Sequence, residues 1–231
     1  HLNTATGDVL GPWALEINGD VTLEREEGAG PTLLDLAQQL AQVGVRRITG
    51  PLQVRSEDGP ADAVYPSVWS SRHRGRLFAP LVGPLTLHEN VVWFTVRPGS
   101  RVGERARLVD ESPAGISSIV TVTATTRSGR RTALAFRPRS GGGWVVSGTI
   151  GVRAGARRFT TVTRDPKAVL GAAWAYALRQ AGITWNQHGT DAFGPGTPRV
   201  LAEVNSPTFD SVASEVNRRS LNLGAELLLQ W

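Results

Sequence analysis

Ser220 and Asn222 are the residues near the C-terminus whose types and spacing could take part in acyl-transfer chemistry. A serine hydroxyl is weak at its ordinary pKa and needs a nearby base, and an acyl transition state needs donors that are already in place. In one group of serine enzymes a Ser-x-x-Lys element supplies the nucleophile and a Lys-Thr-Gly element follows later in the chain. Lys167 is the only lysine here, so it is the first residue to test against that pattern.

Lys167 fits neither of these two elements. Arg164 stands three residues before it, so it does not close a Ser-x-x-Lys, and Ala168-Val169 follow it, so it does not open a Lys-Thr-Gly. A bare Ser-x-Asn is expected by chance on the order of once in a chain of this length. A serine before an apolar helix also commonly caps that helix. From the residues alone, Ser220 is open to a catalytic role or to a capping role.

The composition describes a folded protein with few of the residues that hold metals or cofactors. Of 231 residues, 40% are hydrophobic and 19% are charged, which is typical of a globular chain. There is no cysteine, and His73, His88 and His188 lack the spacing of a helical metal site. The run from Gly141 to Gly143 lacks the spacing and the following helix of a phosphate loop. We therefore expect no metal and no cofactor.

The net charge of +5 comes almost entirely from arginine. Two clusters stand out: Arg72, Arg74 and Arg76, and then Arg127, Arg130, Arg131, Arg137 and Arg139. A basic surface favours polyanions such as nucleic acid or an anionic cell-wall polymer, but it can also be a solvated face. Aromatic residues do not interleave with these arginines, so we expect nucleic acid not to be the partner.

The sequence offers no membrane span, because no apolar run approaches the roughly 20 residues that a bilayer requires. Its start, His1-Leu2-Asn3-Thr4, has neither the charged region nor the apolar stretch of a signal peptide. We expect the N-terminus to be processed, cloned or truncated.

The turn signals and periodicities predict three parts in an α+β chain. Residues 1–79 read as mixed structure, with one helix that has Pro31 at its first position and ends at Gly44. Residues 80–163 read as an antiparallel β module or small barrel. The strands that we expect in it are Val91–Val96, Ile119–Thr126, Thr132–Phe136, Trp144–Val152 and Arg158–Thr163.

Residues 164–231 change to a helical period. Asp165 can cap a helix with Pro166 at its first position, and a second helix begins at Ser206-Pro207 after a short strand, Val200–Val204. Leu223–Leu229 is a third, apolar helix close to the chain end. We expect that helix to lack packing partners here, so that the chain continues in its parent protein or docks there on another chain.

Several segments in order resemble the penicillin-binding protein 4 type of D-alanyl-D-alanine carboxypeptidase/endopeptidase, the S13 peptidase family. The segments that carry the resemblance are Gly19-Asp20-Val21, Gly30-Pro31-Thr32-Leu33, Gly44-Val45-Arg46-Arg47-Ile48-Thr49-Gly50, Pro84-Leu85-Thr86-Leu87-His88-Glu89-Asn90, Arg97-Pro98-Gly99 and Asn217 to Glu226. They extend over roughly residues 8 to 231 but match only the middle of the family's full length. In the last segment Arg218, Leu221 and Gly224 replace the family's lysine, aspartate and bulky residue.

The resemblance implies a fold and a function. It implies mostly β insertion modules followed by a helical portion of a β-lactamase/transpeptidase-like domain. It implies a serine-type peptidase of the periplasm or another extracytoplasmic space, which acts on peptidoglycan stem peptides through an acyl-enzyme and binds β-lactams. Ser220 would be a proton-relay hydroxyl and Asn222 the amide that orients the substrate. The nucleophile and the Lys-Thr-Gly would lie outside this chain.

Two other hypotheses remain beside the enzyme. A non-catalytic relative could bind peptidoglycan or another cell-envelope partner through the β-rich region, and the chain alone does not decide whether it is part of an active enzyme. A basic nucleic-acid-binding domain is the third hypothesis, and it rests on the net charge only.

Overall fold

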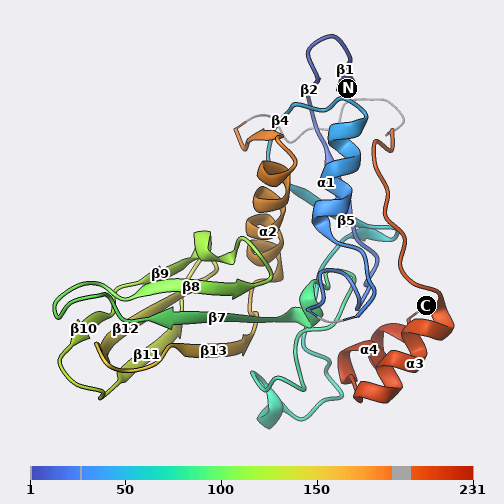
Figure 1. The fold of residues 1–231 in the computed structure, drawn as a ribbon. Coiled ribbons are helices and arrows are strands. Elements are labelled where there is room, and N and C mark those ends of the chain that lie inside the picture. The colour runs from blue at the N-terminus through green and yellow to red at the C-terminus, as the bar shows by residue number, and fades with distance from the viewer. Residues whose placement is uncertain (1, 27, 189–198, 231) are drawn as a thin grey trace.

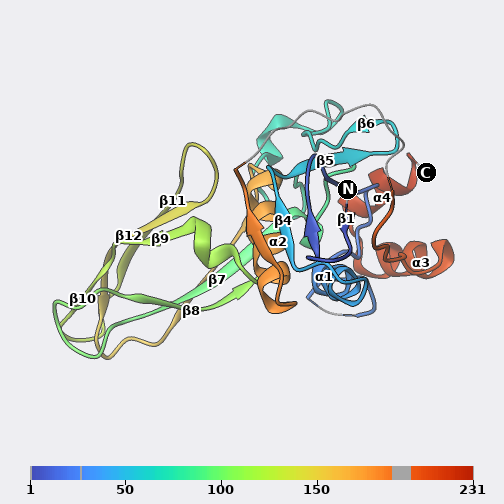
Figure 2. The same ribbon diagram turned by 90° about the horizontal axis from the view of Figure 1, so that it is seen from above.

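The computed structural model describes residues 2–26, 28–188 and 199–230. It has a body, from which residues 91–162 project as an arm (Figure 1). The view from above shows the same projection, with α1 and α2 between the arm and the C-terminal helices (Figure 2). The combination of small sheets and helices confirms the predicted α+β class.

Two small sheets and two helices make up most of the body. The first sheet has the order β1-β2-β4-β14, with β4 parallel to both of its neighbours, and the second has the order β3-β5-β6. The strands of the first are β1 (Leu2–Asn3), β2 (Asp8–Val9), β4 (Arg47–Thr49) and β14 (Thr184–Asn186). Those of the second are β3 (Ala14–Glu16), β5 (Gln53–Ser56) and β6 (Gly59–Pro60).

Both helices begin at residues that satisfy their free backbone N–H groups. Helix α1 (Leu33–Gln42) starts with a capping box between Thr32 and Asp35, so Pro31 lies just outside the helix rather than at its first position. Helix α2 (Pro166–Gln180) begins as predicted, and the carboxylate of its N-cap, Asp165, accepts a hydrogen bond from the backbone of Ala168. The two helices pack against each other.

Helix α2 and β14 belong spatially with residues 1–79, although they follow the arm in sequence. Strand β14 pairs with β4, and the largest fully buried side chain of α2, Trp174, contacts Trp13 at 6.4 Å between ring centroids. The division of the chain into three domains stays a prediction. In this structure, residues of the first and third parts share one core.

The arm consists of two sheets that enclose an aromatic core. One has the order β13-β7-β8, and in the other β12 pairs with β9, β10 and β11. Phe94, Phe136, Phe159 and Trp144 pack between them, with ring centroids 5.4 to 6.5 Å apart. The strands are β7 (Val91–Arg97), β8 (Arg107–Ser112), β9 (Val120–Val122), β10 (Thr125–Arg127), β11 (Ala133–Pro138), β12 (Trp144–Gly151) and β13 (Arg157–Val162).

An entirely antiparallel module was the wrong prediction for the second sheet, because β9 and β10 both run parallel to β12. The single strand predicted over Ile119–Thr126 is also divided. Its first residue belongs to a 3-10 turn, η3 (Ile116–Ile119), and the strand breaks at Ala124. There the backbone N–H groups of Thr123 and Ala124 both donate to the carbonyl of Val146 on β12, which interrupts the regular pairing. The carbonyl of Ala124 accepts from the backbone of Ala106, next to β8, so this break also links the two sheets.

The C-terminal helices pack on a small cluster of their own. Helices α3 (Phe209–Arg219) and α4 (Asn222–Leu228) form a hairpin. Its buried side chains, Val212, Val216, Leu223 and Leu227, pack in one cluster with Val21 and Val82 from earlier in the chain. The expectation that the last helix lacks packing partners in this chain is therefore wrong. Residues 200–204 are not a strand. They cross the body as an extended segment, and the backbone of Glu203 binds the side chain of Gln39.

Two short 3-10 turns, η1 (Ser71–His73) and η2 (His88–Asn90), complete the described elements. Among the helices of the described residues, none combines the length and apolar character that crossing a bilayer requires.

Candidate functional site

Ser220 and Asn222 lie on the turn that joins α3 to α4, and both are exposed. Ser220 ends α3 in the left-handed conformation, with φ 54° and ψ 48°. The backbone N–H of Leu221 returns to the carbonyl of Val216, a C-terminal motif in which glycine usually takes the left-handed position. Ser220 is therefore not the N-cap of α4, because Leu221 holds that position. The capping alternative for Ser220 is wrong.

Residues 65–79 hold this turn in place from one side. The Asn222 side chain donates from Nδ2 to the backbone carbonyl of Phe78 at 2.8 Å. The indole Nε1 of Trp69 donates to Glu226 Oε1 at 2.9 Å, so α4 is joined to the same loop at a second point. The two contacts fix the start of α4. The Oδ1 atom is the hydrogen-bond acceptor of the Asn222 side chain, and it is not used in the bond to Phe78.

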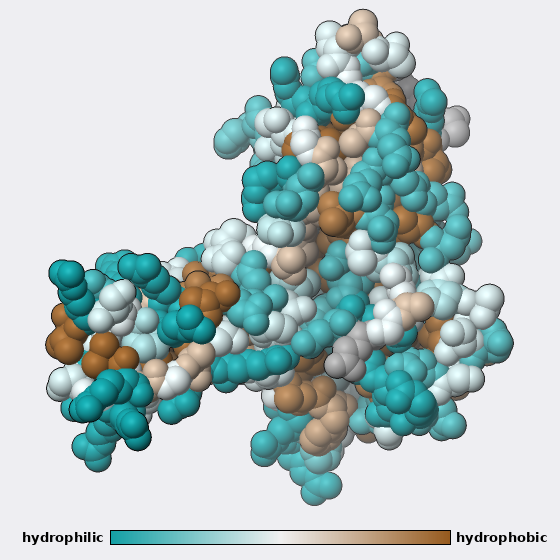
Figure 3. All heavy atoms as spheres, in the orientation of Figure 1, coloured by the Kyte–Doolittle hydropathy of each residue, from teal (hydrophilic) through white to brown (hydrophobic). Residues whose placement is uncertain are grey.

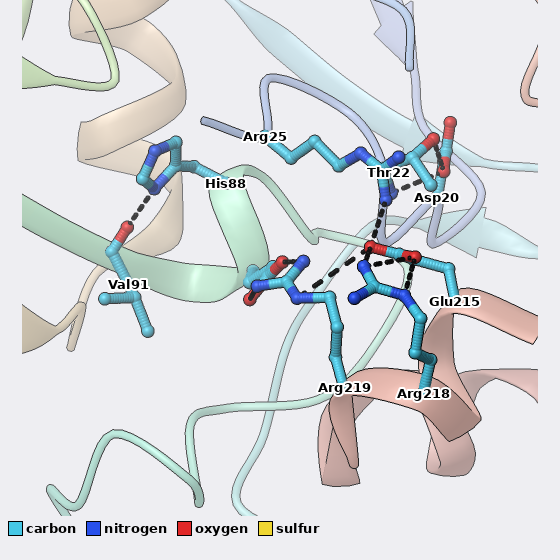
Figure 4. Close-up of polar contacts among 9 residues, drawn as sticks. Asp20, Thr22, Arg25, His88, Val91, Glu215, Arg218 and Arg219 are labelled. Atoms are coloured by element: carbon cyan, nitrogen blue, oxygen red, sulfur yellow. Dashed lines mark hydrogen bonds and ion pairs between the residues drawn. The ribbon is translucent and has the colours of Figure 1, made fainter. Parts of the chain in front are cut away.

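An ion-pair network around Glu215 joins the last turns of α3 to other segments of the chain (Figure 4). Arg218 donates twice to Glu215 within α3, and Arg25 approaches the same carboxylate at 3.5 Å. Arg219 lies 3.9 Å from Glu215 and binds Glu89. The hydrogen bond from Arg218 and the charges of the arginines lower the pKa of the Glu215 carboxyl. The network therefore joins α3 to two segments far away in sequence.

Lys167 is not part of this constellation. It lies in the first turn of α2, and both ribbon views place α2 on the far side of α1 from α3 and α4 (Figures 1 and 2). The structure brings Ser220 and Asn222 together on one turn but leaves the only lysine on another element. Of the three residues considered from the sequence, Ser220 and Asn222 thus lie together and Lys167 lies apart.

A second polar centre lies on the inner side of α4. The buried carboxylate of Asp20 accepts from the backbone and the hydroxyl of Thr22 at 2.7 and 2.6 Å, and from the hydroxyl of Ser206 at 2.8 Å. These contacts fasten the extended segment before α3 to the N-terminal part of the body. Asp20, Ser206 and Leu227 line a cavity of about 560 Å³ with Glu57 of the β5–β6 turn and residues of the second sheet. Its three hydrogen bonds to Thr22 and Ser206 give Asp20 a structural role in holding these segments together.

His88 forms a buried hydrogen-bonded pair at the base of the arm. Its Nδ1 lies 2.6 Å from the carbonyl of Val91, and its Nε2 lies 2.7 Å from the hydroxyl of Ser112. Since a carbonyl only accepts, Nδ1 carries the proton and Nε2 accepts from Ser112. Burial lowers the pKa of His88. The described residues contain no group of histidine and acidic side chains that could hold a metal ion.

The resemblance pointed to Ser220 and Asn222, but the residues that hold their turn in place were not found from the sequence. Glu215, Arg25 and Glu89 come from three separate segments and have no local pattern. The one available signal was the segment from His88 to Asn90, which belongs to the resemblance. In the structure its three residues all have positive φ. This strained turn presents Glu89 to Arg219.

Comparisons with known proteins identify the family and the fold. The model of the D-Ala-D-Ala carboxypeptidase 3 (S13) family matches residues 3–231. A search of curated proteins gave no match.

Two solved structures share the fold. Both are crystal structures of penicillin-binding protein 4 (dacB) from Haemophilus influenzae, and one is complexed with a novel β-lactam. The first has a TM-score of 0.66 and 16% identity, and the second has a TM-score of 0.60 and 17% identity. Each match covers 96% of this chain and 48% or 46% of the solved one, so the chain spans about half their length. Because the family model extends over nearly the whole chain, the chain belongs to the D-Ala-D-Ala carboxypeptidase 3 (S13) family.

Proposed function

We propose that this chain is part of a serine-type D-Ala-D-Ala carboxypeptidase/endopeptidase that cleaves peptidoglycan stem peptides outside the cytoplasm. The observation that carries the proposal is the α3–α4 turn, which exposes Ser220 and Asn222 two residues apart and is anchored through Asn222 to Phe78 and through Arg219 to Glu89. A site that must place groups within about 0.5 Å needs support of this kind. The nucleophile and the Lys-Thr-Gly would come from segments outside residues 1–231.

In the proposed reaction the nucleophilic serine attacks the carbonyl of the penultimate D-alanine, an acyl-enzyme forms, and water then releases it. Ser220 would pass a proton between the base and the leaving amine, and such positioned proton transfer contributes about 10²- to 10⁴-fold. One N–H of Asn222 donates to Phe78, so its Oδ1 would accept the N–H of the stem peptide and its second N–H could donate to a carbonyl of the same peptide. The substrate amide would thereby lie along the turn.

Acylation kinetics of the natural protein with a fluorescent penicillin test this assignment. Ser220→Ala is expected to slow acylation by about 100-fold or more, and Asn222→Ala to weaken it similarly. Ser214→Ala and Asn217→Ala are the matched controls, since both are exposed on α3 and carry the same chemical changes. Equal rates for Ser220→Ala and Ser214→Ala would remove Ser220 from the mechanism.

The alternative is a non-catalytic relative that binds peptidoglycan through its β-rich arm. The exposed arginines of the arm are the observation that favours it. It predicts retention on purified peptidoglycan and no labelling by a penicillin. A protein that is labelled by penicillin would remove this alternative.

A further inference from the structure

Positive charge is concentrated in the arm. Residues 91–162 contain twelve arginines and three acidic residues, a net charge of +9, whereas the whole chain carries +5. The remaining residues therefore carry −4. All twelve arginines are exposed. The molecule has a basic arm on a mildly acidic body, and this separation needs an explanation beyond solubility.

The charge is densest at the end of the arm, which we call the arm tip and define as residues 97–107, 127–131 and 151–157. It holds one acidic residue, Glu104. Its nine arginines are Arg97, Arg101, Arg105, Arg107, Arg127, Arg130, Arg131, Arg153 and Arg157. With the residues that the structure describes, none of these nine side chains forms an ion pair.

Backbone hydrogen bonds bring the three segments of the tip together. Gly103 donates to Thr126, and Thr126 donates to Glu104, at 2.8 and 2.7 Å. Val152 donates to Arg127 at 2.8 Å. The space-filling view shows hydrophilic side chains gathered over the end of the arm, with a few hydrophobic ones among them (Figure 3). The arginines are thus presented from a preorganised platform rather than from a loose loop.

The residue types narrow the class of partner. Arginine binds phosphate through a planar fork of donors. The tip contains no aromatic residue on which a nucleic-acid base could stack. Val102, which is 61% exposed, adds a small apolar contact at the same place. Since the tip is the far end of the arm and the body carries the opposite charge, the molecule would align with a flat surface of phosphates.

We propose that the arm tip docks on the surface of an anionic phospholipid bilayer. The lipid phosphates would bind the unpaired arginines, and the acidic body would be held away from the membrane. Each basic residue near an anionic bilayer strengthens binding about fivefold. This interaction is peripheral, needs no spanning helix and does not depend on the proposed peptidase reaction.

Sedimentation of the natural protein with lipid vesicles tests the proposal. We expect binding to vesicles of phosphatidylcholine mixed with phosphatidylglycerol, no binding to pure phosphatidylcholine, and release at high salt. The variant Arg101→Glu/Arg130→Glu/Arg153→Glu changes one residue in each segment of the tip. It is expected to lower the partition coefficient by at least about 100-fold.

The matched control is Arg72→Glu/Arg76→Glu/Arg199→Glu, which makes the same charge change at exposed positions of the body. It is expected to retain most of the binding, and thermal melting checks that both triple variants fold. An equal loss in the two triples would mean that only net charge matters and would overturn the proposal. Absence of vesicle binding would also overturn it, and so would binding of soluble poly(glycerol phosphate) without vesicle binding.

Discussion

Ser220 occupies a backbone conformation that a serine adopts only at a cost. The left-handed region is unfavourable by roughly 1–2 kcal/mol for a residue with a Cβ, and glycine is the usual occupant at the end of a helix. The serine therefore brings a hydroxyl to a position where stability favours glycine. Such a conflict between stability and residue type is typical of functional sites.

Ser220→Gly is expected to stabilise the protein while it removes the hydroxyl. The free energy of unfolding should rise by up to about 1 kcal/mol, because glycine relieves the strain at φ 54°. Denaturant unfolding measures this change. Ser220→Ala keeps the strain, so it should not show the gain. A glycine variant that is less stable than the alanine variant would contradict the account.

His88 predicts a pH dependence of stability. Its pKa is lowered from 6.5 by burial, although the carbonyl of Val91 and the carboxylates of Glu26 and Glu89 act in the opposite direction. As the pH falls through 6.5, the unfolded chain takes up a proton at this residue that the folded chain does not. Stability from the neutral pair with Ser112 is therefore present above that pH and is lost below it.

His88→Gln should flatten the fall in stability between neutral pH and the lowered pKa. Urea titrations at several pH values measure the slope, and His188→Gln is the control because that histidine is exposed. Burial raises the pKa of Glu24, which has the opposite effect on stability above its ordinary pKa of 4.5. This contribution is common to all the variants and cancels in their comparison. An unchanged slope in His88→Gln would contradict the role of the pair.

At the scale of elements, the α3–α4 hairpin depends on a close approach at Gly224. A Cβ at this position would lie 2.4 Å from Cγ2 of Val216, which is tighter than any real contact. Gly224→Ala should therefore destabilise by about 1–3 kcal/mol through overpacking. We expect hydrogen exchange to increase in residues 209–228, since the hairpin packs on its own small cluster.

Gly171→Ala is the matched control for this prediction. It makes the same change inside α2, where the nearest atom to a new Cβ is 3.9 Å away. Helix propensity should then stabilise the protein by about 0.5–1 kcal/mol. If Gly224→Ala also stabilised the protein, the close packing of the two helices would be disproved.

Elements with strong local signals could be predicted from the sequence. Asp165 and Pro166 marked the start of α2, and the β-branched and aromatic run gave β7. Strand β8 was missed because four of its six residues are polar or charged and none is buried, so pairing with β7 decides its conformation. The predicted strand over residues 200–204 failed for the converse reason: its apolar pattern packs as an extended segment with no strand partner.

The site could be predicted only in part, because contacts between residues distant in sequence leave no local pattern. Ser220 and Asn222 lie two residues apart, so a short motif contains both. The groups that hold their turn in place are far away in sequence. Phe78 binds Asn222 from 144 residues away, and Glu89 binds Arg219 from 130 residues away. No local period or spacing encodes such contacts. They become visible only when the chain is folded.

At the scale of the whole molecule, this chain joins an α/β body, a basic arm and a helical hairpin whose turn carries Ser220 and Asn222, the two residues that we propose for catalysis. The body and the hairpin are joined by the cluster of Val21 and Val82 with the hairpin's apolar side chains, by the Glu215 network and by the bond from Asn222 to Phe78. The solved relatives are about twice as long, and the rest of their chains has no counterpart here. The central claim is therefore that this turn completes a serine acyl-transfer site whose nucleophile lies outside residues 1–231.

The most direct test is to label the natural protein with a fluorescent penicillin and to locate the acylated residue by mass spectrometry. The account predicts an intact mass well above 24.7 kDa and label on a serine outside these residues, within a Ser-x-x-Lys element. A mass near 24.7 kDa without label, or label on Ser220 itself, would contradict it.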